Sequence, residues 1–115
     1  MNGLQGRVIW ITGFSGAGKT TLANKLSSEI VDKGFSVVRL DGDDLREVFG
    51  ATADYGRNSR LKLSMQYAQL CKLLSAQGHI VIIATISMFR EVYKWNRSNL
   101  PYYLELQQLV HSAPC

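Results

Sequence analysis

Short apolar runs alternate with longer stretches of helical periodicity along this chain. Residues 7–12 are β-branched and aromatic and lead into a glycine, which predicts a strand. Residues 36–40 predict a second strand and residues 102–106 a fourth. Between them, the run 79–85 is apolar throughout, as expected of a strand that is covered on both faces. This pattern favours a parallel sheet with helices on both sides.

Apolar residues recur at helical spacing between these strands. A leucine or isoleucine returns every fourth residue over 18–33, and Gly34 ends that pattern. A short helix is expected around 45–49, a long one at 59–77 and another near Phe89. The long helix carries one apolar stripe, made of Leu63, Tyr67, Leu70 and Leu74. Strand–helix alternation predicts a three-layer α/β domain with a mostly parallel sheet.

The composition narrows the range of partners. A chain of 115 residues with 46% apolar and 19% charged residues is expected to pack as one globular domain. The net charge of +4 is spread along the chain, which suits a phosphate-bearing ligand better than a nucleic-acid surface. No signal peptide or bilayer-length apolar run is visible, so a cytoplasmic protein without a membrane partner is expected.

A complete phosphate-loop pattern, G-x-x-x-x-G-K-[ST], stands between the first strand and the first helix. It is made of Gly13, Phe14, Ser15, Gly16, Ala17, Gly18, Lys19 and Thr20. Glycines let successive N–H groups turn inward around an anion, and the helix adds its positive N-terminal end. Lys19 is expected at the β- and γ-phosphates and the Thr20 hydroxyl at Mg²⁺. Since a chance glycine-rich turn would lack this context, the pattern predicts binding of ATP or a similar triphosphate with Mg²⁺.

An acidic segment, Asp41-Gly42-Asp43-Asp44, follows the second strand. Its carboxylates could hold Mg²⁺ through water or accept a proton from an attacking hydroxyl. The alternative is a cap for the short helix that follows, which suits Asp44 best. Asp41 and Asp43 are expected to be functional, because their strand should end near the phosphate loop.

Three motifs, in this order and spacing, resemble those of adenylylsulfate kinase, which phosphorylates the 3′-hydroxyl of adenosine 5′-phosphosulfate with ATP. The motifs are residues 13–21, residues 40–46 with Arg60, and the pair Ile86-Ser87. The resemblance runs from about residue 6 to residue 106. It implies a three-layer P-loop kinase fold, with a kinase domain at 1–106.

The resemblance also implies a role for each matching residue. Asp43 would be the base or positioning group at the acceptor hydroxyl, with Lys19 at the transferred phosphate and Thr21 completing the phosphate loop. Asp41 would serve the metal and the substrate. The remaining acceptor contacts would come from Arg46, Tyr55, Arg60, Ile86 and Ser87. Ser87 matches a serine described in the family as a phosphorylated intermediate, although direct in-line transfer needs no covalent stop at this catalytic position.

Two departures leave the acceptor open. Leu63 stands where the family usually has an asparagine that helps to hold the substrate, and Met88 replaces a proline. Residues 87–97 look more like divergent relatives from bacterial surface-polysaccharide pathways, one of which phosphorylates a cytidine diphosphate derivative. The small-molecule nucleotide acceptor is therefore either adenosine 5′-phosphosulfate or such a cytidine nucleotide.

The chain beyond the fourth strand does not match the family pattern. Residues 107–115 are expected to be a non-family tail, with the fold's last strand and basic lid missing. An unpaired sheet edge favours self-association, and a homodimer is one assembly that it would allow. Three hypotheses stay open: a kinase of the adenylylsulfate kinase type, an inactive nucleotide-binding fragment, and a GTPase-like switch. The switch is disfavoured because no Asn-Lys-x-Asp motif is present.

Overall fold

The computed structural model describes residues 6–14, 18–50, 56–86 and 88–108. The predicted site residues Ser15, Gly16, Ala17, Tyr55 and Ser87 lie outside the described ranges, so their predicted roles stay predictions. The helices and strands, in chain order, are β1 (Arg7–Thr12), α1 (Lys19–Asp32), β2 (Val37–Asp41), α2 (Gly42–Val48), α3 (Arg57–Ala76), β3 (Ile80–Thr85), α4 (Arg90–Asn99) and β4 (Tyr103–Gln107).

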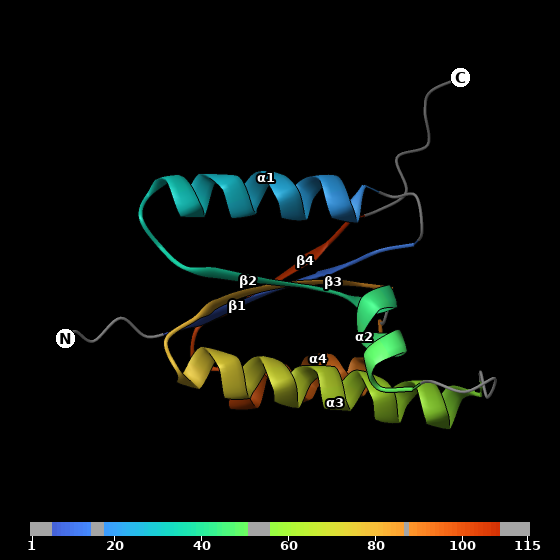
Figure 1. The fold of residues 1–115 in the computed structure, drawn as a ribbon. Coiled ribbons are helices and arrows are strands. Elements are labelled where there is room, and N and C mark those ends of the chain that lie inside the picture. The colour runs from blue at the N-terminus through green and yellow to red at the C-terminus, as the bar shows by residue number, and fades with distance from the viewer. Residues whose placement is uncertain (1–5, 15–17, 51–55, 87, 109–115) are drawn as a thin grey trace, which may run out of the picture.

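The strands form one parallel sheet in the order β2-β3-β1-β4 within the described residues. Helix α1 covers one face of the sheet, while α3 and α4 cover the other (Figure 1). Every residue of β3 is buried, because this strand lies inside the sheet and is covered on both faces. The predicted three-layer α/β fold is confirmed.

Two hydrophobic clusters, one on each face, hold the layers together. Trp10 of β1 and Ile83 of β3 pack with residues of α3 and α4, and Ile11 and Ile82 pack with Ala23 of α1. Neighbouring residues of a strand point to opposite faces, so one apolar run supplies both clusters. The core therefore requires both helical layers at once.

The predicted elements are correct in type and differ from the structure at their ends. Helix α2 begins at Gly42, so the acidic segment expected as a turn is the first turn of a helix. Helix α3 begins at Arg57, two residues before the expected start. The strand predicted at 36–40 is shifted by one residue, because pairing of Asp41 with Ala84 extends β2 to that position. In the described part of the chain, no helix combines the length and the apolar character needed to cross a bilayer.

Because β3 is fully buried, truncation of even a small side chain in this strand is predicted to lower the free energy of unfolding substantially. Val81 is fully buried, and Val81→Ala is expected to lower the free energy of unfolding by about 2 kcal/mol through lost contacts and a residual cavity. Urea denaturation at 25 °C measures this change. The matched variant Val48→Ala removes the same two methyl groups from a side chain that is 77% exposed, and its effect should stay within about 0.5 kcal/mol. Equal losses in the two variants would contradict the assigned core.

Candidate active site

The strands that precede the three sequence motifs end in one row. Thr12 at the end of β1 lies opposite Thr85 at the end of β3, and Asp41 at the end of β2 lies opposite Ala84. Helix α2 and the N-terminal ends of α1 and α3 lie at this same end of the sheet (Figure 1). The motifs, widely separated in sequence, are thus brought to one edge, as the parallel topology predicts.

The phosphate loop is bounded by two glycines whose positions exclude other residues. A Cβ atom added to Gly13 would lie 2.4 Å from the Gln108 carbonyl oxygen, closer than any packed carbon approaches an oxygen. Gly18 has a φ of 92°, in the left-handed region, and forms the N-cap of α1. The loop therefore leaves β1 in close backbone contact and enters α1 through a sharp turn.

The N-terminus of α1 suits an anion. Its N-cap, Gly18, has no side chain, and the first helical turn contains no acidic residue. The backbone N–H groups of this turn and the positive end of the helix dipole are consequently not neutralised by a carboxylate. Lys19 adds a cation, and its Nζ donates a hydrogen bond to the Phe14 carbonyl oxygen at 3.2 Å. This combination of N–H groups and an ammonium fits a polyphosphate.

Helix α2 differs from α1 because a carboxylate caps it. Asp41 is the N-cap, and its Oδ1 accepts a hydrogen bond from the Asp43 backbone N–H at 2.8 Å. The expectation that Asp44 is the cap was wrong, since helix α2 begins three residues before the predicted start. Gly42 is buried, and an added Cβ would lie 3.1 Å from the Thr85 Oγ1. The start of α2 therefore packs directly on the end of β3, and Asp43 is exposed beside it.

Tyr67 of α3 packs against α2 and holds its first residue in place. Its hydroxyl donates to the Gly42 carbonyl oxygen at 3.4 Å, and its ring centroid lies 5.9 Å from that of Phe49. Burial raises the pKa of Tyr67 to about 12, a shift that Arg46 opposes and Asp43 reinforces. The hydroxyl thus stays protonated at neutral pH and senses both charged residues. The sequence identified Tyr67 only as part of an apolar stripe, because the contact of its hydroxyl has no local signature.

The start of α3 is tied to the segment that follows β3. The Arg57 guanidinium forms an ion pair with Glu91 at 2.8 Å and lies over the Phe89 ring, 5.2 Å from its centroid. This distance is within the range of a cation–π contact. The pair is solvent-exposed, so it contributes little to stability and mainly orients the two segments. Arg57 was not identified from the sequence, since its partners lie more than thirty residues away.

All of the predicted site residues that the structure describes lie at this edge of the sheet. They are Gly13, Phe14, Gly18, Lys19, Thr20, Thr21, Asp41, Asp43, Arg46, Arg60 and Ile86. Arg60 is exposed in the first turn of α3, and Ile86, directly after β3, is 46% exposed. Leu63, one turn further along α3, packs against the core instead. Nucleotide-binding and acceptor-binding candidates are therefore placed side by side, with an apolar residue where an asparagine was expected.

Magnesium is compatible with the donors at this edge. Among the described residues, no three histidine, cysteine, aspartate or glutamate side chains are close enough to form a metal site of their own. Mg²⁺ usually binds through only one or two protein ligands together with phosphate oxygens and water. Thr20 and Asp41 fit this donor set, because the Asp41 carboxylate has lone pairs beyond the one that accepts the Asp43 N–H.

A hollow of about 520 Å³ lies at the other end of the sheet. It is bordered by Arg7 and Ile80, the first residues of β1 and β3, and by Phe35 between α1 and β2. Its lining is mainly apolar, and the motif residues described above do not border it. It is therefore not part of the candidate active site.

The fold is a parallel sheet between helical layers. Its first strand leads through a complete phosphate-loop sequence into a helix without a capping side chain, and this combination defines a P-loop nucleotide-binding protein. A family model for adenylylsulphate kinase matches residues 5–114. This chain belongs to that family.

Known relatives agree with this assignment. The cytidine diphosphoramidate kinase of Campylobacter jejuni is 42% identical over 86% of this chain and 58% of its own length. A probable adenylyl-sulfate kinase of Pyrococcus abyssi is 33% identical over 90% of this chain and 59% of its own. The chain thus spans about three fifths of the length of these relatives.

A solved structure has the same fold. The APS kinase CysC of Mycobacterium tuberculosis, in complex with AMPPNP and APS, superposes with a TM-score of 0.80 at 28% identity. The match covers 90% of this chain and 62% of that one.

Asp41 is predicted to have a capping role that can be measured apart from any metal role. Asp41→Ala removes the N-cap of α2 and should lower the free energy of unfolding by about 1 kcal/mol. Asp41→Asn is the matched variant, because an asparagine caps equally well but carries no charge, and its stability should stay within about 0.3 kcal/mol of the wild type. Chemical denaturation at 25 °C distinguishes the two. If both variants lost the same stability, the carboxylate charge rather than the cap would be responsible.

Proposed function

We propose that this chain forms the nucleotide-binding part of a cytoplasmic, ATP-dependent kinase that phosphorylates a hydroxyl group of a small nucleotide. The observation that carries the proposal is the shared sheet edge. The strand that leads into the phosphate loop and the strand that leads into the carboxylates of α2 end there in one row. Family membership supports the same reaction. The 1–106 domain and the tail at 107–115 remain a proposed division.

The nucleotide phosphates are held by the loop and the start of α1. The N–H groups of residues 13–21 would bind the phosphate oxygens, and Lys19 would supply the cation that stabilises charge on the transferred phosphoryl group. Mg²⁺, when bound, neutralises the β- and γ-phosphate oxygens, and Thr20 and Asp41 would hold it. These residues bind and orient; they do not change covalently.

The acceptor is placed by the residues of α2 and α3. The oxygen of the acceptor hydroxyl bonds to the γ-phosphorus of ATP, and the hydroxyl proton passes to the Asp43 carboxylate. At the same time the bond between the γ-phosphorus and the bridging oxygen breaks, and ADP leaves with that oxygen. Arg46 and Arg60 fit the anionic groups of a nucleotide acceptor. Tyr55, Ile86 and Ser87 complete the proposed pocket, and the transfer is direct, so Ser87 forms no phosphorylated intermediate.

Two acceptors follow from the relatives. Adenosine 5′-phosphosulfate is the acceptor that the family name describes, and APS occupies the Mycobacterium tuberculosis structure. Cytidine diphosphoramidate is favoured by the 42% identity to the Campylobacter jejuni enzyme and by Leu63, which offers no hydrogen bond to an acceptor. We infer that the cytidine nucleotide is the better acceptor and that adenosine 5′-phosphosulfate is the alternative.

Release of ADP from Mg-ATP tests the proposed kinase. Release should depend on one of the two acceptors and should fall by about 100-fold or more in Lys19→Ala, because a cation is lost from the transition state. The matched control is Lys25→Ala, an exposed lysine on the same helix, which should leave the rate unchanged. A chain that binds ADP but releases none with either acceptor would favour the inactive nucleotide-binding fragment. Preference for GTP would instead favour the switch.

The role of residue 63 in acceptor choice gives a second test. Leu63→Asn should shift the ratio of dissociation constants toward adenosine 5′-phosphosulfate by about ten-fold, the effect of one well-placed hydrogen bond. Leu73→Asn makes the same chemical change at an exposed position of α3 and should leave the ratio unaltered. Binding is measured by calorimetry on variants shown by thermal denaturation to be folded. An unchanged ratio in Leu63→Asn would remove this residue from the specificity argument.

A further inference from the structure

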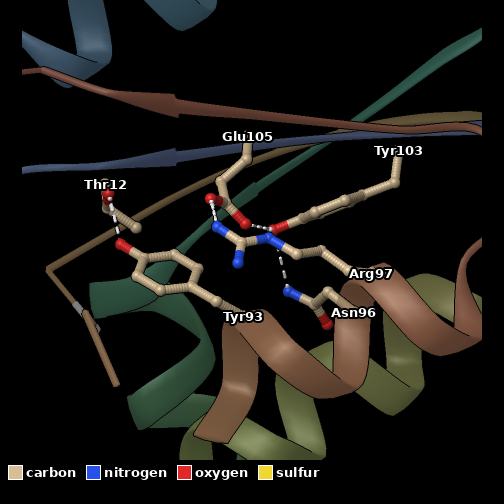
Figure 2. A network of polar contacts seen from close by, with 6 residues as sticks. All are labelled: Thr12, Tyr93, Asn96, Arg97, Tyr103 and Glu105. Carbon is tan, nitrogen blue, oxygen red and sulfur yellow. Dashed lines mark hydrogen bonds and ion pairs between the residues drawn. The ribbon is translucent and has the colours of Figure 1, made fainter. Parts of the chain in front are cut away.

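A buried hydroxyl pair lies directly behind the phosphate loop. Thr12 is the last residue of β1 and is fully buried. Its Oγ1 shares a hydrogen bond of 2.8 Å with the Tyr93 hydroxyl, which reaches it from α4 (Figure 2). The next residue, Gly13, begins the phosphate loop, so this bond fixes the point from which the loop departs.

Backbone contacts restrain Thr12 within the plane of the sheet. Its carbonyl oxygen accepts a hydrogen bond of 2.7 Å from the Gln108 N–H, and it lies opposite Thr85 of β3. Both contacts lie in the plane of the sheet, along the direction of its hydrogen bonds. The Tyr93 hydroxyl adds a restraint from the helical layer, roughly perpendicular to the others.

Close packing around Gly13 prevents its backbone from adjusting when Thr12 moves. The space beside its Cα is closed by the Gln108 carbonyl oxygen, which an added Cβ would approach to 2.4 Å. A displacement at Thr12 is therefore transmitted into the loop, because packed backbone cannot take it up locally. The loop's N–H groups act on a phosphate only when they are held in place.

Tyr93 is itself held on both sides. It lies in the first turn of α4, where its N–H donates to the Phe89 carbonyl oxygen, and the Arg97 guanidinium lies over its ring at 5.9 Å. Arg97 pairs with Glu105 of β4 (Figure 2). Burial raises the pKa of Tyr93, so its hydroxyl remains protonated at neutral pH. The hydroxyl is thus presented to Thr12 from an anchored ring.

We propose that Tyr93 is a positioning residue for the phosphate loop, acting through its hydrogen bond to Thr12. The proposal rests on the proposed nucleotide binding of this loop. Because α4 begins just after the segment that contains Ile86 and Ser87, the same tyrosine also links the acceptor side of the site to the nucleotide side.

The same network contains a matched control. Tyr103 of β4 accepts a hydrogen bond from the Asn96 side chain at 3.2 Å and donates one of 2.8 Å to Glu105 (Figure 2). Tyr103→Phe therefore removes a partly buried hydroxyl between α4 and β4, as Tyr93→Phe does between α4 and β1. Only the second change touches Thr12. A purely structural role would lower the melting temperature in both variants and change phosphate binding in neither.

The experiment measures the binding of ADP and of inorganic tripolyphosphate to the 115-residue chain by calorimetry at 25 °C. Tyr93→Phe should weaken both ligands by about three- to ten-fold, the range for one hydrogen bond, and Tyr103→Phe should stay within two-fold of the wild type. Thr12→Val, a change of nearly equal volume, should weaken binding as much as Tyr93→Phe. The double variant should be no weaker than either single one, because both remove the same bond.

Three results would overturn the proposal: unchanged affinity in Tyr93→Phe, an equal loss in Tyr103→Phe, or additive losses in the double variant. A different result would show that the proposed nucleotide binding itself is wrong. In that case the wild-type chain would bind neither ADP nor tripolyphosphate, and Lys19→Ala would not change binding. Thermal denaturation of each variant confirms that the measured chains are folded at 25 °C.

Discussion

The parallel pairing of β1 with β3, in register from Arg7 with Ile80 to Thr12 with Thr85, decides where the chemical groups of this protein lie. Parallel strands place their carboxyl ends at one edge, so the loops that follow them must meet there. The pairing is stable only when both faces are covered, which is why α1 and the α3–α4 layer are both needed. The active-site edge is thus a consequence of how the core is covered.

Helices α1 and α2 begin at this edge with opposite electrostatic character. Helix α1 starts at a glycine without a cap or an acidic first turn, whereas α2 starts at Asp41 with Asp43 and Asp44 behind it. One helix end therefore suits a phosphate, while the other is already satisfied by a carboxylate and offers acidic groups instead. A phosphoryl donor and a hydroxyl acceptor need these two environments next to each other. The sheet supplies that proximity by ending β1, β2 and β3 in one row.

Polar side chains connect the layers where the apolar core stops. The Tyr67 hydroxyl supports the start of α2, and the Tyr93 hydroxyl supports the end of β1. The ion pair of Arg57 with Glu91 joins the start of α3 to the start of α4. Each contact lies under or beside a motif without belonging to it.

The sequence alone determined the strands, the phosphate loop and the family, because each depends on residues close together in the chain. Glycine, lysine and threonine spacing defines the loop, and a short, β-branched apolar run such as 79–85 favours a strand that is covered on both faces. The tertiary structure decided that Asp41 rather than Asp44 caps α2, because β3 pairing extends β2 to that residue. It also decided the contact between Thr12 and Tyr93, which are 81 positions apart. Residues so distant leave no local pattern, since only the packing of α4 against the sheet brings their hydroxyls together.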